Sequence, residues 1–103
     1  MTGTIFTAFL ERIAISLREV SDEDLLKRYS TTRDEAAFQE IVRRHGGMVT
    51  DVCQSVLRNR ADAEDVFQAT FFQVHQKRDS FEEGRKFRPW LYTIATNQAI
   101  VEQ

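Results

Sequence analysis

A short acidic segment, ADAEDVFQ at residues 61–68, carries the first side chains whose types and spacing suit binding chemistry. Glu64 and Gln68 are four residues apart and share one face of a helix, whereas Asp65 is rotated from Glu64 by about 100 degrees. With Asp62 beside it, this face can form ion pairs with a basic partner. The alternative is a solvated helix start whose acidic side chains complement the helix dipole. The spacing alone leaves both interpretations open.

A second segment, residues 81–92, interleaves aromatic and basic side chains. Cations can neutralise phosphates and aromatic rings can stack on unpaired bases, so this composition is typical of a surface that binds nucleic acid. The alternative is that Phe87 and Trp90 anchor the last helix in the core. The aromatic and basic members of the segment are Phe81, Arg85, Lys86, Phe87, Arg88, Trp90 and Tyr92.

Residues that could catalyse a reaction or bind a metal are few. His45 and His75 lie 30 residues apart, and neither belongs to a metal-binding pattern such as H-E-x-x-H. We therefore expect His45 to be structural at a helix end and His75 to occupy a surface or boundary position. Cys53, the only cysteine, lies on an apolar stripe, which predicts a buried and unreactive thiol. The sequence predicts a protein that is not an enzyme and has no metal site or cofactor.

The composition describes one compact domain. The chain has 103 residues, of which 42% are hydrophobic and 29% are charged, and its net charge is −2. No apolar run reaches the roughly 20 residues of a membrane helix, and the start of the chain lacks the basic residues of a secretory signal. We therefore expect no membrane insertion and a cytoplasmic location. The net charge does not predict a strong isolated DNA binder.

Helical periodicity dominates the chain and predicts five or six helices without a sheet. We expect an amphipathic helix over residues 4–18, within an N-terminal extension that covers residues 1–20. Ser21 and Asp34 are expected to cap the next two helices, the first of which runs through Tyr29. The remaining boundaries are a break or bend at Gly46-Gly47, a turn at Asn59-Arg60, a helix over residues 63–76 capped by Asp62, a polar loop at residues 77–86, and a last helix that starts near Pro89.

Four segments occur in order over residues 21–100, namely DEDLLKRY, DEAAFQEIVRRHGGMV, ADAEDVFQATFFQVHQ and FRPWLYTIATNQAI. Together they resemble region 2 of sigma-70-type transcription initiation factors, in particular the extracytoplasmic-function (ECF) group. The resemblance implies an all-α compact bundle over residues 21–103. It also implies that this domain binds the clamp helices of the RNA polymerase β′ subunit, and that it recognises and melts the −10 element of promoters.

The resemblance assigns the acidic segment to core RNA polymerase. The family's D-A-E-D-x-x-Q pattern is present, and its members are expected to contact basic β′ residues. Phe67 and Phe71 are expected to support this helix from the core. The predicted polymerase-binding residues are Asp62, Glu64, Asp65 and Gln68.

The resemblance assigns the loop at residues 77–86 and the last helix to promoter DNA. The family's loop captures a base flipped from the non-template strand, and its F-R-x-W-L pattern is present here. Arg88 is expected to contact a phosphate, and Asn97 to face the promoter strand. Trp90 either contacts DNA at the melted junction or holds the helix in place. The predicted DNA-binding residues are Phe81, Arg85, Lys86, Arg88, Trp90 and Asn97.

The chain departs from the family pattern in its last helix, where Val101 replaces the aspartate of N-x-A-I-D. The helix-turn-helix domain with which ECF factors read the −35 element is also missing, which predicts a fragment, a single expressed domain or a natural truncation. These departures leave a second interpretation open. The domain would then be an interaction module, a polymerase-binding remnant or the target of an anti-sigma factor, without productive promoter recognition.

Overall fold

The computed structural model describes residues 5, 17–57 and 60–102, and this part of the chain is helical without any strand. The all-α prediction is therefore confirmed, whereas nearly all of the helix expected over residues 4–18 lies outside the described residues. The elements are α2 (Asp22–Thr32), α3 (Glu35–Val56), α4 (Arg60–Lys77), the 3-10 helix η1 (Arg78–Ser80) and α5 (Phe87–Glu102).

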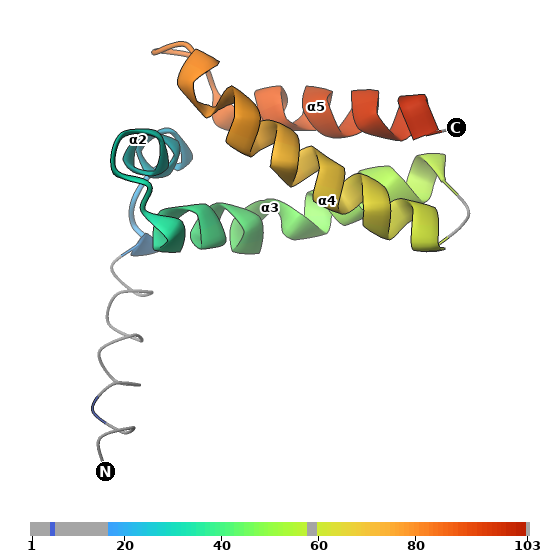
Figure 1. Ribbon diagram of the computed structural model, residues 1–103, viewed down its shortest axis with the longest axis horizontal. Helices are drawn as coiled ribbons and strands as arrows, with labels where there is room; N and C mark the ends of the chain where they lie inside the picture. The colour runs from blue at the N-terminus through green and yellow to red at the C-terminus, as the bar shows by residue number, and fades with distance from the viewer. Residues whose placement is uncertain (1–4, 6–16, 58–59, 103) are drawn as a thin grey trace.

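Three of the helices form the body of the bundle. In Figure 1, α3 and α5 run in the same direction. Helix α4 runs in the opposite direction, from the end of α3 back toward the start of α5. Each of these helices contacts the other two. The short helix α2 is seen end-on in this view and packs mainly against α3. The connection from α4 to α5 and the start of α2 therefore lie at one end of the bundle.

The core lies between these helices and consists of the apolar positions that recur at helical spacing. Burying each large apolar side chain contributes roughly 1.5–3 kcal/mol to folding. None of the described helices is long and apolar enough to cross a membrane. The largest side chains that are fully buried include Phe87, Leu25, Leu26, Ile41, Leu91, Val49, Val66 and Val74.

Two of the three predicted capping residues, Ser21 and Asp34, are confirmed. The Ser21 hydroxyl accepts a hydrogen bond from the Asp24 backbone N–H at 3.1 Å, which caps α2. The Asp34 carboxylate accepts hydrogen bonds from the N–H groups of Ala36 and Ala37 and caps α3. Each cap satisfies N–H groups that have no partner within the first turn of a helix.

Several predicted boundaries are wrong. Gly46 and Gly47 do not break the helix, because α3 continues through them to Val56. A glycine inside a helix costs about 1 kcal/mol relative to alanine, and the buried stripe on both sides of the pair outweighs that penalty. One helix therefore stands where two were expected, and the described residues contain four α-helices instead of five or six.

The ends of the helices also differ from the expectation by a few residues. Helix α2 continues to Thr32, three residues beyond Tyr29, and α5 begins at Phe87, two residues before Pro89. Helix α4 begins at Arg60, so Asp62 lies in its first turn and is not its cap. The predicted turn at Asn59-Arg60 lies partly outside the described residues, and Arg60 is helical. Cap geometry depends on backbone angles that side-chain types specify only loosely.

Candidate functional site

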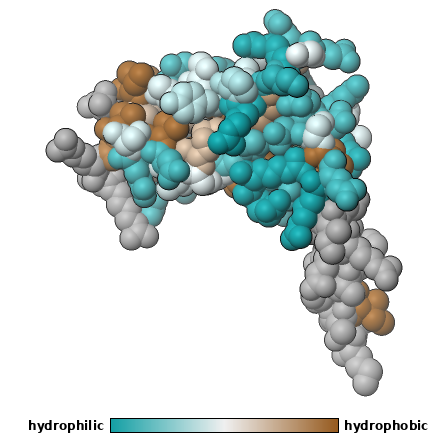
Figure 2. Space-filling view, turned by 180° about the vertical axis from the view of Figure 1, so that it is seen from behind, coloured by the Kyte–Doolittle hydropathy of each residue, from teal (hydrophilic) through white to brown (hydrophobic). Residues whose placement is uncertain are grey.

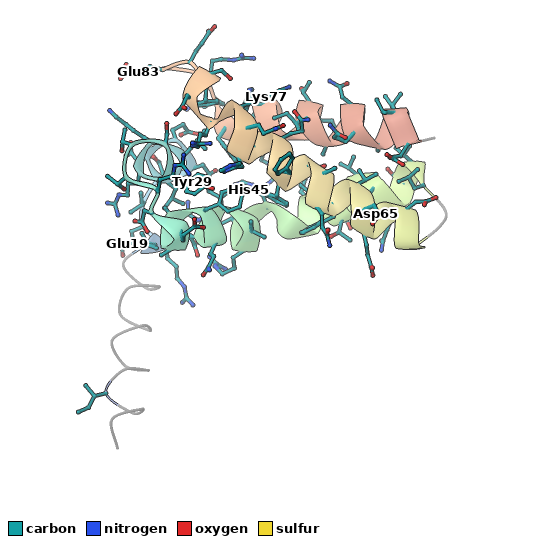
Figure 3. The ribbon with its side chains drawn as sticks, viewed as in Figure 1. Glu19, Tyr29, His45, Asp65, Lys77 and Glu83 are labelled. Carbon is teal, nitrogen blue, oxygen red and sulfur yellow. The ribbon has the colours of Figure 1, made fainter. Side chains whose placement is uncertain are left out.

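The predicted polymerase-binding residues lie on the first half of α4. Glu64, Asp65 and Gln68 are exposed, and Asp62 is half-buried. We call these four residues the acidic surface. Asp65 lies near the start of α4, as Figure 3 shows, far from the connection to α5. The backbone hydrogen bonds within a helix fix the relative positions of such side chains, and no contact with another segment is needed.

An apolar groove of about 400 Å³ continues the acidic surface along α4. Gln68 belongs to both, and Phe72 in the groove is 57% exposed, although it is a large aromatic residue. Phe72 is not among the predicted site residues. Its position nevertheless places it on the same face of α4 as the acidic surface, since it follows Gln68 by four residues and Asp65 by seven. The groove is lined by Tyr29, Glu35, Phe38, Val42, Phe67, Gln68, Phe71, Phe72 and His75.

The predicted support for this face is present in the structure. Phe71 is buried in the core cluster, and Phe67 is half-buried against it. Their ring centroids lie 5.0 Å apart, and Phe38 meets the edge of Phe71 at 6.4 Å. The aromatic residues below α4 therefore fix its orientation on α3.

A second cavity, of about 370 Å³, lies between the end of α4, the loop before α5 and one face of α5 from Pro89 to Gln98. We call it the Trp90 pocket. It brings together four of the six predicted DNA-binding residues, Arg85, Lys86, Trp90 and Asn97. Trp90 and Asn97 share one face of α5 because they are seven residues apart. The complete lining is Gln73, Lys77, Arg85, Lys86, Pro89, Trp90, Thr93, Ile94, Asn97 and Gln98.

The other two predicted DNA-binding residues do not line the Trp90 pocket. Phe81 is half-buried beneath it, with its ring centroid 5.0 Å from Trp90 and 6.2 Å from Phe87. Arg88 is exposed on a different face of α5. Phe81 thus supports the pocket wall in this structure, and the contacts with DNA predicted for Phe81 and Arg88 stay predictions.

Helix α4 also contributes to this pocket, through two residues that were not predicted. Gln73 and Lys77 are four residues apart on the second half of α4, so they share a face. Their spacing was visible in the sequence, but nothing there showed that this face meets α5. In Figure 3, Lys77 lies near the end of α4, and Asp65 lies near its start. The acidic surface and the Trp90 pocket are therefore at opposite ends of one helix.

A tight turn directs the two loop cations toward the pocket. The Arg85 N–H donates to the Glu82 carbonyl at 3.2 Å, and Gly84 within this turn has a positive φ of 89 degrees. Residues with a Cβ rarely adopt that conformation, so glycine suits this position. The turn brings Arg85 and Lys86 onto the pocket side of the loop.

A partly buried ion network joins α2 and α3. Arg44 donates to Glu40 at 2.8 Å, to Asp22 at 3.1 Å and to the Leu17 carbonyl at 2.7 Å. Arg43 forms two further hydrogen bonds with Glu40, both 2.7 Å long. Those bonds, with help from Arg44, overcome desolvation and lower the pKa of Glu40 to about 2. Glu40 is therefore ionised throughout the physiological pH range.

The histidines and the cysteine occupy structural positions. His45 is 4% exposed, with its Nε2 atom 2.9 Å from Asp22 Oδ1. His75 is half-buried and shares a 2.6 Å hydrogen bond with the Tyr29 hydroxyl. Cys53 is fully buried, and desolvation raises the pKa of its thiol. Within the described ranges, no three His, Cys, Asp or Glu side chains gather closely enough to hold a metal ion.

Comparisons with known proteins identify the family. The Sigma-70 region 2 family model matches residues 41–102. The RNA polymerase sigma factor CarQ of Myxococcus xanthus is 44% identical over 63 residues, which are 61% of this chain and 36% of CarQ. The ECF RNA polymerase sigma factor SigW of Bacillus subtilis is 40% identical over 67 residues, 65% of this chain and 36% of SigW. The matched segment thus spans about a third of each relative.

A solved structure supports the same assignment. An engineered region 2 of sigmaE, determined by NMR in complex with GTAAAA, superposes with a TM-score of 0.72 at 32% sequence identity. The match covers 81% of this chain and 85% of that structure. Fold, sequence and family model agree with the resemblance found in the four segments, and the chain belongs to the sigma-70 region 2 family, within the ECF group of sigma factors.

Proposed function

We propose that this domain binds core RNA polymerase through the acidic surface and holds unpaired bases of the −10 element in the Trp90 pocket. It would thereby direct transcription initiation at selected promoters, in the cytoplasm. The observation that carries the proposal is the pocket itself. Arg85 and Lys86 from the loop meet Trp90 and Asn97 from α5 in one cavity, at the opposite end of α4 from the acidic surface. The domain can therefore engage both partners at once.

The polymerase side of the proposal rests on charge and shape. Glu64, Asp65 and Gln68 are exposed on α4 and would accept hydrogen bonds from basic side chains of the β′ clamp helices. The adjacent groove with Phe72 would receive apolar side chains of the same helices. Interfaces commonly combine an apolar centre with a charged rim that sets specificity and association rate.

The DNA side rests on the composition of the Trp90 pocket. Its cations, Lys77, Arg85 and Lys86, would neutralise phosphates, and the Trp90 ring would stack on a base. Asn97 would hydrogen-bond to a base edge, which gives selectivity that stacking lacks. Extracting a base from the duplex costs a few kcal/mol, and these contacts would offset that cost without any covalent step.

The DNA side is tested by titrating a fluorescein-labelled GTAAAA hexanucleotide with the chain at low salt and following anisotropy. We choose this probe because the solved relative holds the same sequence. We expect saturable binding that the Arg85→Ala variant weakens. Arg28→Ala is the matched control, since Arg28 is an exposed arginine on α2 and does not line the pocket. Equal affinities of Arg85→Ala and wild type would contradict the proposal.

A second candidate function follows from the end of α5. Ile100 is 54% exposed and Val101 is 78% exposed, and Figure 2 shows apolar surface gathered at this end of the molecule. An apolar face at this position favours a protein partner, such as an anti-sigma factor, and the domain would then be an interaction module without productive promoter recognition. Binding of polymerase without any saturable binding of the hexanucleotide would favour this candidate.

A further inference from the structure

The first turn of α2 contacts the start of α5 directly. The Phe87 backbone N–H donates a hydrogen bond to Glu23 Oε2 at 2.9 Å, although the two residues are 64 positions apart. The first N–H groups of a helix have no partner within that helix, and a carboxylate near them is also favoured by the helix dipole. Glu23 thus stabilises the N-terminus of α5 from another helix.

Phe87 connects this hydrogen bond to the wall of the Trp90 pocket. Its side chain is fully buried, with its ring centroid 5.7 Å from Trp90 and 6.2 Å from Phe81. Phe81 and Trp90 contact each other at 5.0 Å, so the three rings form one cluster. Closely packed cores transmit displacements because they contain few voids. A shift of the Phe87 backbone would therefore move Trp90.

A second contact from α2 reaches the same ring. Asp22 Oδ1 lies 2.9 Å from His45 Nε2, and the His45 ring centroid lies 5.2 Å from that of Phe87. Phe87 is thus held from two sides, directly by Glu23 and through His45 by Asp22. Glu23 itself does not line the Trp90 pocket. Any effect of Glu23 on the pocket must pass through Phe87 or the adjoining loop.

We propose that Glu23 is a positioning residue for the Trp90 pocket, which holds the start of α5 and the preceding loop in the geometry that accepts an unpaired base. The inference rests on the proposed function for the role of the pocket, but the placement of Trp90 is a property of the chain alone. Glu23 has no predicted contact with DNA or polymerase.

The negative charge of Glu23 and its hydrogen bond to Phe87 predict opposite effects of Glu23→Ala on the affinity for the hexanucleotide. Removing a negative charge from a nucleic-acid-binding protein strengthens its attraction to phosphates. Losing the hydrogen bond to Phe87 frees the start of α5 and should weaken binding. We expect the affinity for the hexanucleotide to fall about fivefold, which corresponds to roughly 1 kcal/mol for one hydrogen bond.

The experiment compares Glu23→Ala and Glu23→Gln with a matched control, Asp24→Ala. Glutamine keeps an acceptor oxygen and should restore most of the affinity. Asp24 lies in the same first turn of α2, is exposed and carries the same charge, so Asp24→Ala reports the effect of charge and helix dipole alone. We expect Asp24→Ala to bind the hexanucleotide as tightly as wild type or slightly more tightly.

Fluorescence of Trp90 is the second readout, since the chain contains a single tryptophan. Glu23→Ala should shift the emission to longer wavelength and increase acrylamide quenching, at temperatures where circular dichroism shows full helicity. Wild-type values of affinity, emission and quenching in folded Glu23→Ala would overturn the inference. An equal loss of affinity in Asp24→Ala would also overturn it, because the effect would then belong to the first turn of α2 in general and not to the hydrogen bond between Glu23 and Phe87.

This design separates the inference from the proposed function. If wild type does not bind the hexanucleotide, the proposed role of the pocket fails, and the Trp90 fluorescence of the three variants still decides whether Glu23 positions the ring. If wild type binds and Glu23→Ala matches it in both readouts, only the role of Glu23 fails.

Discussion

The acidic surface and the Trp90 pocket lie on the same helix but are built in different ways. The acidic surface occupies consecutive turns of α4, and its exposed side chains need only that helix to hold their spacing. The Trp90 pocket combines the end of α4, a loop with a tight turn and one face of α5. A surface on one helix tolerates changes elsewhere in the fold, whereas an assembled pocket depends on every segment that supports it.

The first prediction, which has the largest expected effect, concerns the dependence of the Trp90 pocket on the core beneath it. Phe87→Ala removes a fully buried ring beneath the pocket and should lower the free energy of unfolding by about 3–5 kcal/mol. Phe72→Ala, next to the acidic surface, removes a ring that is 57% exposed and should change it by less than about 1 kcal/mol. Urea denaturation followed by circular dichroism measures both. Similar losses of unfolding free energy in the two variants would contradict the difference between the Trp90 pocket and the acidic surface.

The second prediction concerns the ion network that ties α2 to α3. The depressed pKa of Glu40, about 2 in the folded state, stabilises the fold above the unfolded-state pKa of 4.5. That contribution declines as the pH falls from 4.5 toward 2, because protons then bind the unfolded chain more readily than Glu40 in the folded one. It amounts to at most about 3 kcal/mol.

The measurement is the difference in unfolding free energy between wild type and Glu40→Gln at several pH values. We expect this difference to be constant from pH 7 to about 5 and to shrink in more acidic solution. A difference that stays unchanged down to pH 3 would show that Glu40 is not held ionised by Arg43 and Arg44.

The third prediction tests whether Lys77, at the basic end of α4, contacts a phosphate of the oligonucleotide. Lys77→Ala should weaken binding of the hexanucleotide about threefold and reduce the slope of log affinity against log salt by about 0.7, the value for one phosphate contact to a single strand. Arg28→Ala, which removes the same charge from α2, should leave the slope unchanged. An equal change of slope in both variants would mean that net charge, and not the pocket, attracts the oligonucleotide.

The fourth prediction, also of small effect, tests the glycine pair in the middle of α3. Gly47 lies within the helix, and a Cβ atom built there meets no atom within 4 Å. Gly47→Ala should therefore raise the free energy of unfolding by about 0.5–1 kcal/mol, since alanine loses less conformational freedom. Thermal denaturation would show a higher midpoint. A lower midpoint would indicate that α3 needs a glycine to bend at this position.

Features within one helix could be predicted from the sequence. The spacing of Glu64, Asp65 and Gln68 specified a shared exposed region because helix geometry alone relates those positions. The caps at Ser21 and Asp34 were also predictable, since each depends on one side chain and the next few N–H groups. The resemblance to the sigma-70 family, which the comparisons confirm, rested on four such segments in order.

Features that combine distant segments could not be predicted in the same way. Four of the six predicted DNA-binding residues meet in the Trp90 pocket, but the α4 side of that pocket was missed. The hydrogen bond between Glu23 and Phe87 spans 64 positions, and no local pattern indicates it. The break predicted at Gly46-Gly47 failed for a related reason, because packing along α3 outweighed the local preference of glycine.

The most direct test of the account compares two variants with two partners. Glu64→Lys/Asp65→Lys and Arg85→Ala would each be titrated with core RNA polymerase and with the hexanucleotide, after circular dichroism has confirmed their folding. We predict that the charge reversal weakens polymerase binding at least about tenfold, as loss of charge-assisted contacts implies, and does not weaken hexanucleotide binding. Arg85→Ala should show the reverse pattern. If either variant weakened both interactions equally, the claim of two separate binding surfaces on this domain would be contradicted.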